Sequence, residues 1–281
     1  MKGKTCIITG ATDGIGLEAA ARLGALGARL VLVGRNRDKG ERALTILRSR
    51  VPGLIAEMHY ADLSRRDEIR RLVPELLSAA PRIDVLLNNA GAFFARRDVT
   101  EDGLERTFAL NHIGYFLLTH LLRDRVIASA PARIVNVASG AHRKAVLDFD
   151  DLQCAKRYSG WLAYQRSKLC NILFTRELAR RLVGRSVTAN SFSPGFVATR
   201  FGNQAGGIAA LYLRIAKLFA GTQEQGAETL VWLASSPDVA ATSGEYFYRG
   251  QRGTLTAAAQ DDALARRLWD VSEELAAKAT A

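Results

Sequence analysis

The stretch TGATDGIG, residues 9–16, joins an apolar run at 5–9 to a segment of helical spacing at 15–26. Glycine lets a backbone turn sharply and approach a pyrophosphate, whose charge then meets free N–H groups at the start of a helix. The spacing is GxxxGxG and not the more common GxGxxG, and a lone glycine loop can be only a tight turn. Its place between a strand and a helix predicts a dinucleotide site at Gly10, Thr12, Asp13, Gly14, Ile15 and Gly16.

Strand and helix patterns alternate along the rest of the chain. Further strands are predicted at 28–33, 56–60, 84–87, 133–137, 187–192 and 245–248, and further helices at 39–50, 67–79, 104–122 and 158–182. Strands without polar alternation, separated by helices, indicate a parallel sheet covered on both faces. No linker or repeat divides the chain. We therefore expect an α/β fold: a single doubly wound (Rossmann) domain over residues 1–281.

Two stretches, 140–160 and 196–222, interrupt this alternation. In doubly wound folds the loops at the carboxyl ends of the strands form the ligand crevice, so both are expected to be substrate walls. The second is expected to be a substrate lid within the domain. Its apolar side chains suit an apolar ligand, although they would serve equally well to pack on the core or on a second subunit. These side chains are Leu211, Tyr212, Leu213, Ile215, Leu218 and Phe219.

Composition argues against several classes of protein. The net charge of +11 could indicate nucleic acid, an anionic membrane or an acidic ligand as partner. The basic residues are scattered, however, and read as solvated helix faces, for example Arg65, Arg66, Arg70 and Arg71. We therefore expect no nucleic-acid partner.

The cysteine pattern and the lengths of the apolar runs indicate the cellular compartment of the protein. Cys6 and Cys170 read as small core residues and the three cysteines form no CxxC pair, which fits a reducing compartment. A strand begins within a few residues of the N-terminus, which leaves no room for a signal peptide, and no apolar run approaches the ~20 residues that span a bilayer. The four histidines form no ligand cluster. A cytoplasmic protein without bound metal or membrane insertion is expected.

The residues at the end of the second predicted strand indicate which adenosine ribose, with a 2′-hydroxyl or a 2′-phosphate, would be bound. An acidic residue there would bind the ribose 2′-hydroxyl, whereas arginine accommodates a 2′-phosphate. The chain has Arg35, Asn36 and Arg37, with no acid before Asp38. Asp13 counts against a phosphate, since it adds negative charge nearby. NADP is favoured as cofactor, and NAD stays open.

Tyr164, Lys168 and Ser139 indicate the chemistry. A tyrosine four residues before a lysine places both on one helix face, and a nearby cation favours the phenolate and lowers the phenol pKa. Such a pair alone is usually a solvent-facing stripe. Combined with Ser139 at a strand end and with the glycine loop, it predicts a proton donor for a carbonyl that receives a hydride.

The order of these motifs resembles that of the short-chain dehydrogenase/reductase family. Matching elements are the TGxxxGIG loop, Asp62, the Asn-Asn-Ala-Gly run at 88–91, Asn111, Ser139, Tyr164 with Lys168, and Pro194-Gly195. NVASGAH at 136–142, LAY at 162–164, SKL at 167–169, NILF at 171–174 and ARRLW at 265–269 are similar to the retinol dehydrogenase-like branch. The resemblance covers almost the whole chain.

The resemblance implies a role for each matched residue. Tyr164 would exchange a proton with the reacting oxygen, Lys168 would lower the tyrosine pKa and hold the nicotinamide ribose, and Ser139 would bind the reacting oxygen. Asn111 would support a water relay reaching Lys168. The implied cofactor contacts are Asp62 and Leu63 at the adenine, Asn89, Ala90 and Gly91 along the trough, and Pro194, Gly195, Val197 and Thr199 at the nicotinamide.

The sequence thus indicates hydride transfer between NADP(H) and a hydrophobic carbonyl or alcohol, such as an aldehyde, retinoid, steroid or polyketide-like ketone. The alternative is a catalytically silent dinucleotide-binding regulator, which a changed tyrosine, lysine or serine would favour, and all three are intact. In the family, helices like those at 104–122 and 158–182 pair subunits, so a homodimer or homotetramer is compatible, although monomers also occur. Trp161 and Tyr158 either line the substrate site or only pack.

Overall fold

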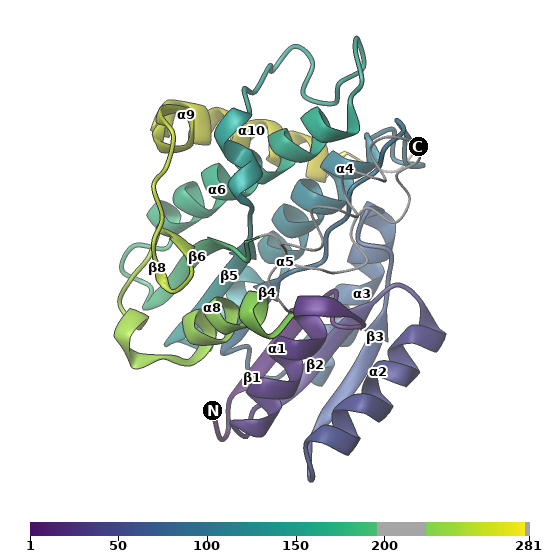
Figure 1. The fold of residues 1–281 in the computed structure, drawn as a ribbon, viewed down its shortest axis with the longest axis vertical. Helices are drawn as coiled ribbons and strands as arrows, with labels where there is room; N and C mark the ends of the chain where they lie inside the picture. The colour runs from purple at the N-terminus through teal and green to yellow at the C-terminus, as the bar shows by residue number, and fades with distance from the viewer. Residues whose placement is uncertain (196–222, 279–281) are drawn as a thin grey trace.

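The centre of the molecule is an eight-stranded β-sheet with the order β3-β2-β1-β4-β5-β6-β7-β8 (Figure 1). The computed structural model describes residues 1–195 and 223–278. All neighbouring strands are parallel except β8, which pairs antiparallel with β7. The strands are β1 Thr5–Thr9, β2 Arg29–Gly34, β3 Ala56–Tyr60, β4 Val85–Asn88, β5 Ala132–Val137, β6 Val187–Ser193, β7 Tyr246–Tyr248 and β8 Gln251–Arg252.

The strand order reverses beside β1, and this reversal determines where a ligand can bind. From β1 the chain builds outward through β2 to β3, and it then returns to the other side of β1 as β4. Helices that follow β1 and β4 therefore leave the sheet in opposite directions. The crevice between them, at the carboxyl ends of the strands, is the ligand position of doubly wound sheets. The predicted α/β Rossmann fold is confirmed, with β8 as an antiparallel addition.

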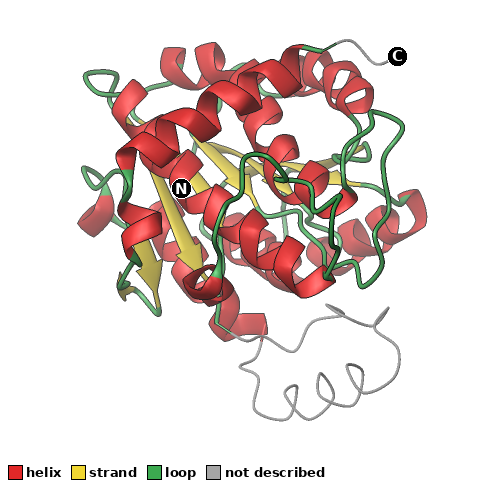
Figure 2. Cartoon of the chain, turned by 90° about the horizontal axis from the view of Figure 1, so that it is seen from above, coloured by secondary structure: helices red, strands yellow, loops and turns green. Residues whose placement is uncertain are grey.

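Helices cover both faces of the sheet, as the view from above shows (Figure 2). One face carries α1, α2 and α8, and the other carries α3, α5 and α6. Their bounds are α1 Gly14–Ala25, α2 Arg37–Arg50, α3 Arg66–Ala79, α4 Arg106–Phe108, α5 Gly114–Ala128, α6 Gly160–Arg181, α8 Gln223–Ser235, α9 Ala257–Gln260 and α10 Asp262–Ala277.

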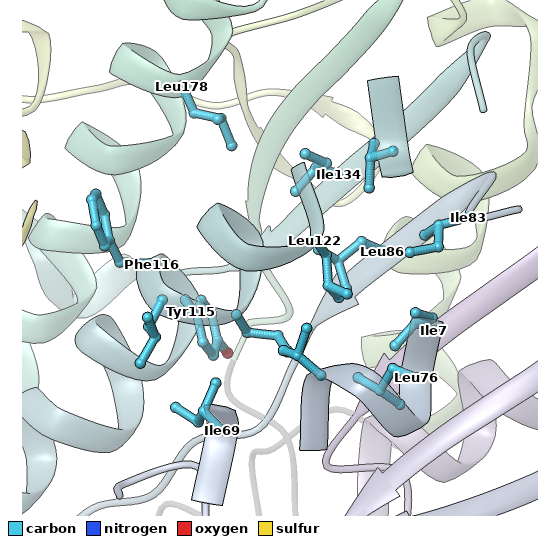
Figure 3. Close-up of a cluster of buried hydrophobic side chains, with 14 of the residues drawn as sticks. Ile7, Ile69, Leu76, Ile83, Leu86, Tyr115, Phe116, Leu122, Ile134 and Leu178 are labelled. Carbon is cyan, nitrogen blue, oxygen red and sulfur yellow. The ribbon is translucent and has the colours of Figure 1, made fainter. Parts of the chain in front are cut away.

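Alternating side chains of the buried strands supply both cores. Ile7 of β1 packs with α3 and α5, whereas its neighbours Cys6 and Ile8 point to the α1 and α8 side. Figure 3 shows the first of these cores, in which Leu76 of α3 and Phe116 of α5 lie near strand residues such as Leu86. Because central strands such as β1 and β4 are buried on both faces, their apolar runs have no polar alternation.

The predicted helix at 104–122 is wrong in its bounds and in its regularity. Helical structure begins with α4 at Arg106, passes through a π-helical turn at Ala109–Ile113 and continues as α5 to Ala128. The turn inserts one i→i+5 step, which rotates the side chains on either side of it relative to one another. Asn111 lies in the middle of this turn.

The C-terminal helix α10 closes the outside of α5 and α6. Trp269 of α10 packs edge-on against Phe116, with ring centroids 4.9 Å apart, and stacks with Phe174 at 5.9 Å. Helices α8 and α10 and strand β8 were not among the elements predicted from periodicity. The amphipathic segment 208–219 and the predicted lid at 196–222 lie outside the described residues.

Arg66 joins the start of α3 to the end of α10. Its guanidinium donates to the carbonyl oxygens of Leu275 and Lys278, and its Nε lies 3.5 Å from a carboxylate oxygen of Asp102. Arg66 is buried, so the expectation that this arginine lies on a solvated face is wrong. Cations near the last carbonyls of a helix are favoured by hydrogen bonding and by the helix dipole. In the described ranges, no helix is long and apolar enough to cross a membrane.

Candidate active site

The glycine loop between β1 and α1 is folded tightly against the end of β4. Gly10 has φ +67°, and a Cβ atom there would lie 2.8 Å from Cα of Ala90. A Cβ at Gly16 would lie 2.4 Å from the Gly10 carbonyl oxygen. Neither position accepts a side chain, since both contacts are with backbone atoms. The glycines are thus required for the loop to close on itself.

The side chain of Asn89 holds this loop by hydrogen bonds. Its Nδ2 donates to the carbonyl oxygens of Thr9 at 2.9 Å and Gly10 at 3.1 Å. The Thr9 hydroxyl accepts from the backbone N–H groups of Asn89 and Ala90. The side chain of Asn89 therefore holds the loop, whereas Gly91 is exposed, and a cofactor contact of Asn89 stays a prediction.

The start of α1 offers donors to a phosphate. Asp13 caps the helix by accepting from the N–H of Gly14 at 2.8 Å. The N–H groups that follow, of Ile15 and Gly16, have no intrahelical partner at a helix start and lie next to the loop. A pyrophosphate fits this end of the helix because the dipole is positive there. Asp13 acts as the cap, and this accounts for an acid inside a phosphate loop.

The candidate ribose site lies at the end of β2. Gly34 approaches the loop so closely that a Cβ atom there would lie 2.5 Å from Cγ2 of Thr12. Arg35 follows, with a side chain that is 57% exposed, and pairs with Asp62 at 3.3 Å. The Arg37 guanidinium lies 4.7 Å from the ring centroid of Tyr60. Both arginines are exposed beside the phosphate loop, so the residues present fit a 2′-phosphate.

The neighbouring polar side chains have local structural roles. Asn36 caps α2 by accepting from the N–H of Lys39 at 2.9 Å. Asp62 accepts from both the N–H and the hydroxyl of Ser64. Burial raises the pKa of Asp62, but the bonds from Ser64 and the charge of Arg35 outweigh burial and hold this pKa below its ordinary value. The Leu63 side chain belongs to the core, which leaves only its backbone for a cofactor.

Tyr164 and Lys168 lie on the inner face of α6, beside the end of β5. Tyr164 is buried and forms a hydrogen bond with Ser139, the residue that caps the short 3₁₀ turn Gly140–Lys144. Lys168 Nζ donates to the Val137 carbonyl oxygen at 3.0 Å and lies 5.6 Å from the ring centroid of Tyr164. The structure therefore brings the three residues together at one position.

Burial controls the protonation of this pair. It raises the pKa of Tyr164 to about 12, and the hydrogen bond with Ser139 lowers that pKa without offsetting burial. Burial also lowers the pKa of Lys168 to about 7. The expected lowering of the tyrosine pKa is thus wrong for this structure, because desolvation raises this pKa more than the hydrogen bond with Ser139 lowers it. A phenol with a raised pKa keeps its proton at neutral pH and can give it to a carbonyl oxygen.

Asn111 is held in place by every polar atom of its side chain. Oδ1 accepts from the N–H of Ala92 at 2.9 Å, and Nδ2 donates to the Ala92 carbonyl at 3.0 Å and to the Ser167 hydroxyl at 3.1 Å. Both Oδ1 and Lys168 Nζ face Gly91, where a Cβ atom would lie 3.2 Å from Oδ1 and 3.6 Å from Nζ. Asn111 thus fastens the loop after β4 to α6, and its part in a water relay stays a prediction.

His112, next to Asn111, is fixed from the opposite side by α10. Its Nε2 lies 2.8 Å from the Ser272 hydroxyl oxygen, and that hydroxyl lies 2.7 Å from the Leu268 carbonyl. The serine proton is committed to the carbonyl, so Ser272 accepts from His112 and Nε2 carries the ring proton. Complete burial lowers the pKa of His112 to about 3. The π-turn is therefore fastened on one side to α6 and on the other to α10.

Ser167 and Asn171 begin the SKL and NILF matches, but no role at the site was predicted for either of them. Asn171 Nδ2 donates to the Val137 carbonyl at 3.0 Å, the same oxygen that accepts from Lys168. Ser167 links Asn111 to the carbonyl of Tyr164, to which its hydroxyl donates at 2.8 Å. The signal was present in the sequence: positions 164, 167, 168 and 171 share one helix face.

The remaining predicted cofactor residues lie at the end of β6. Pro194 and Gly195 follow this strand, and Gly195 has φ +79°, a conformation that favours glycine. Val197 and Thr199 lie outside the described residues. Among the residues that the structure describes, no group of three histidine, cysteine, aspartate or glutamate side chains could hold a metal ion.

Comparison with known proteins identifies the family to which this arrangement belongs. The short chain dehydrogenase family model matches residues 4–206. The chain belongs to the short-chain dehydrogenase family. Retinol dehydrogenase 14 from Homo sapiens is 42% identical over 97% of the chain and 86% of its own length, and retinol dehydrogenase 12 from Homo sapiens is 39% identical over 98% and 87%.

Solved structures agree with this assignment. The crystal structure of an uncharacterized protein from Mycobacterium paratuberculosis aligns with a TM-score of 0.79 at 30% identity, covering 100% of this chain and 96% of that one. An NAD(P)-dependent gluconate 5-dehydrogenase from Beutenbergia cavernae, with bound NADP, aligns with a TM-score of 0.73 at 26% identity, covering 89% and 96%. The protein is an NAD(P)-dependent short-chain dehydrogenase/reductase, similar to retinol dehydrogenases.

Proposed function

We propose that this enzyme transfers a hydride between NADP(H) and a hydrophobic carbonyl or alcohol, with Tyr164 as the general acid and base. The observation that carries the proposal is the buried Tyr164, bonded to Ser139 and adjacent to Lys168, at the crevice edge of the sheet. The names of the relatives, retinol dehydrogenases 12 and 14, support a hydrophobic alcohol or aldehyde of the retinoid kind as substrate.

The residues of the chain would divide the work as follows. The nicotinamide, when bound, supplies or takes up the hydride. Tyr164 donates its phenolic proton to the carbonyl oxygen in reduction and takes it back in oxidation. Ser139 donates to the same oxygen and stabilises its developing negative charge. Lys168, fixed by the Val137 carbonyl, places its amine next to the phenolate that results and stabilises it when protonated.

The preference for NADP would come from Arg35 and Arg37. Both are exposed at the end of β2, next to Thr12 of the phosphate loop, and neither is fully neutralised: Arg37 stacks on Tyr60 and Arg35 meets one oxygen of Asp62. A 2′-phosphate can take the place of Asp62 as partner of Arg35 through stronger, charge-assisted bonds. The NADP bound to the Beutenbergia cavernae enzyme supports this choice.

The cofactor preference has a direct test. We expect the double variant Arg35→Ser, Arg37→Ser to raise KM for NADPH by about 100-fold or more, since each of the two charge-assisted phosphate contacts is worth roughly 1.5 kcal/mol or more. KM for NADH should change little, and Arg42→Ser, on the exposed face of α2, serves as the control. Wild-type enzyme with a lower KM for NADH than for NADPH would refute the preference.

Activity itself is tested by NADPH consumption against a panel of hydrophobic aldehydes and ketones, with the matching alcohols and NADP in reverse. A separate fluorescence titration measures cofactor binding. Turnover in either direction supports the proposed enzyme. NADPH binding without consumption across both panels would support the regulator instead.

The location is proposed from the state of the cysteines, and the assembly from the family resemblance. Cys6, Cys154 and Cys170 are buried and unpaired, as expected in a reducing compartment, which supports the cytoplasm. Subcellular fractionation tests this location.

A homodimer or homotetramer is compatible with the family resemblance, and sedimentation equilibrium would measure the number of subunits. A mobility-shift assay at several salt concentrations tests the proposal that nucleic acid is not a partner.

A further inference from the structure

An aromatic wall stands beside the reacting hydroxyl. It consists of Phe93, from the loop after β4, and Trp161, from the first turn of α6. The Trp161 ring is stacked on the Tyr164 ring, with centroids 5.8 Å apart and an interplanar angle of 26°. Phe93 meets the Tyr164 ring edge-on at 6.3 Å and the Trp161 ring at 6.5 Å. Three rings from two segments therefore meet at the group expected to move the proton.

The wall is held rigidly. The loop of Phe93 runs so close to the start of α6 that a Cβ at Gly160 would lie 2.3 Å from the Phe94 carbonyl oxygen. The same oxygen accepts from the hydroxyl of Tyr158 at 2.8 Å. Phe94 points away from the wall and lies under the guanidinium of Arg106, 4.8 Å from it. Loop and helix are thus locked together, and Phe93 is placed relative to Trp161 before any ligand arrives.

The two aromatic residues near the start of α6 have different roles. Tyr158 is partly buried and uses its hydroxyl to hold the Phe94 backbone, which makes it a packing residue. Trp161 is 48% exposed, although indole is a large apolar group that is usually mostly buried. Its ring contacts the Tyr164 ring on one side and still leaves about half of the residue exposed. Packing alone does not explain this exposure.

We propose that Trp161 and Phe93 make the site selective for aryl aldehydes and ketones, and for the matching aryl alcohols, over saturated compounds of the same size. This inference rests on the proposed function. The ring centroids of Trp161 and Phe93 lie 5.8 and 6.3 Å from that of Tyr164, so the part of the substrate that contacts these rings is the group attached to the reacting carbon. Aromatic rings gain from edge-to-face and offset stacking, which a puckered saturated ring cannot adopt.

The experiment compares benzaldehyde with cyclohexanecarbaldehyde, whose six-membered rings differ in planarity. The quantity measured is the ratio of kcat/KM for the two aldehydes with saturating NADPH. Their different intrinsic reactivities cancel when this ratio is compared between variants. The variants are Trp161→Leu, Phe93→Leu and the conservative Trp161→Phe. Trp232→Leu is the control, since Trp232 lies on α8 and packs on Phe247.

We expect Trp161→Leu to lower the ratio about three- to tenfold, the size that ring stacking gives to binding, and Phe93→Leu to lower it less. Trp161→Phe should restore most of the ratio, and Trp232→Leu should leave it unchanged. Because Trp161 is about half exposed, its two variants should keep the melting temperature of the wild type. An unchanged ratio in Trp161→Leu would overturn the inference.

A binding measurement keeps the inference testable if neither aldehyde is turned over. Equilibrium dialysis with 2-naphthamide, an unreactive aryl carbonyl, compares its Kd for wild type and Trp161→Leu in the presence of NADPH. Binding at least threefold tighter to the wild type supports the wall, and equal affinities overturn it. Failure of all carbonyls to consume NADPH would instead count against the proposed function, so the two failures are distinguishable.

Discussion

Tyr164 holds its proton more firmly than its spacing from Lys168 implies. Burial raises its pKa to about 12, so at neutral pH the group beside the reacting oxygen is a phenol. The helix period alone is enough to place Tyr164 and Lys168 together. It does not show how deeply they are buried, and burial decides the sign of the pKa shift. The residues of this site could therefore be predicted from the sequence, whereas their protonation could not.

Replacing Tyr164 by phenylalanine tests its role as proton donor. We expect Tyr164→Phe to lower kcat by about 10²–10⁴, the range for loss of a positioned acid, because no proton is available at the carbonyl oxygen. The Kd for NADPH should stay within about twofold, since the ring is retained. NADPH consumption and a fluorescence titration give the two numbers. Near-normal turnover by this variant would contradict the assigned role.

His112 should make the protein sensitive to acid. Its pKa is about 3 in the folded protein and 6.5 in the unfolded chain, so between these values the unfolded chain binds more protons. The stability that His112 contributes is complete above pH 6.5 and is lost as the pH falls toward 3. At pH 4.5 the loss is roughly 2–3 kcal/mol, from 1.36 kcal/mol per pH unit.

The measurement is urea unfolding at pH 7.5, 6, 5 and 4.5 for the wild type and for His112→Gln. We expect the free energy of unfolding of the wild type to fall more steeply with acid than that of the variant, whose glutamine does not titrate. Parallel curves would show that His112 does not govern the acid response.

At the scale of elements, the π-turn depends on its attachment to α10. Ser272→Ala leaves the buried Nε2–H of His112 without an acceptor, at a cost of about 1–3 kcal/mol in the free energy of unfolding. Ser235→Ala is a matched control, because the Ser235 hydroxyl likewise donates to a helix carbonyl, that of Val231, at 2.7 Å. Urea unfolding compares the two variants. Equal losses would mean that the bond to His112 contributes nothing.

The elements themselves were predictable to different degrees. Buried parallel strands give short apolar runs, and β1 has the bounds that its run predicts. The half-buried strand β3 also has its predicted bounds. The π-turn at Ala109–Ile113 could not be predicted from the sequence, because one longer hydrogen-bonded step changes the backbone without changing the composition of the helix. Helix α10 was not predicted, although its apolar side chains follow a helical period and it contains the ARRLW match at 265–269.

On the scale of the whole molecule, Arg66 connects α3 with the end of α10, more than 200 residues later in the chain. Arg66→Gln removes the donor to two α10 carbonyls and leaves the buried carboxylate of Asp102 without its cation. Breaking such a buried pair costs about 3–5 kcal/mol. The mid-point of urea unfolding should fall accordingly.

Arg65→Gln is the control for this change. Arg65 stands one residue earlier and forms ion pairs with Asp67 and Glu101 at the surface, where water and salt screen them. We expect its unfolding mid-point to stay near that of the wild type. If both variants lost stability equally, the link between α3 and the end of α10 would not be what stabilises the fold.

The buried thiols can be used as probes of local opening of the molecule. Cys6 lies in β1, Cys170 in α6 and Cys154 in the loop before α6, so each cysteine reports on a different element of the fold. A thiol reagent can label such a cysteine only while its surroundings are open, and its labelling rate then reports the frequency of that opening. Loop breathing would label Cys154 first, whereas Cys6 and Cys170 would wait for the sheet and the helix that carries Tyr164 to come apart. Mass spectrometry of the unaltered chain could thus time the opening of each layer separately.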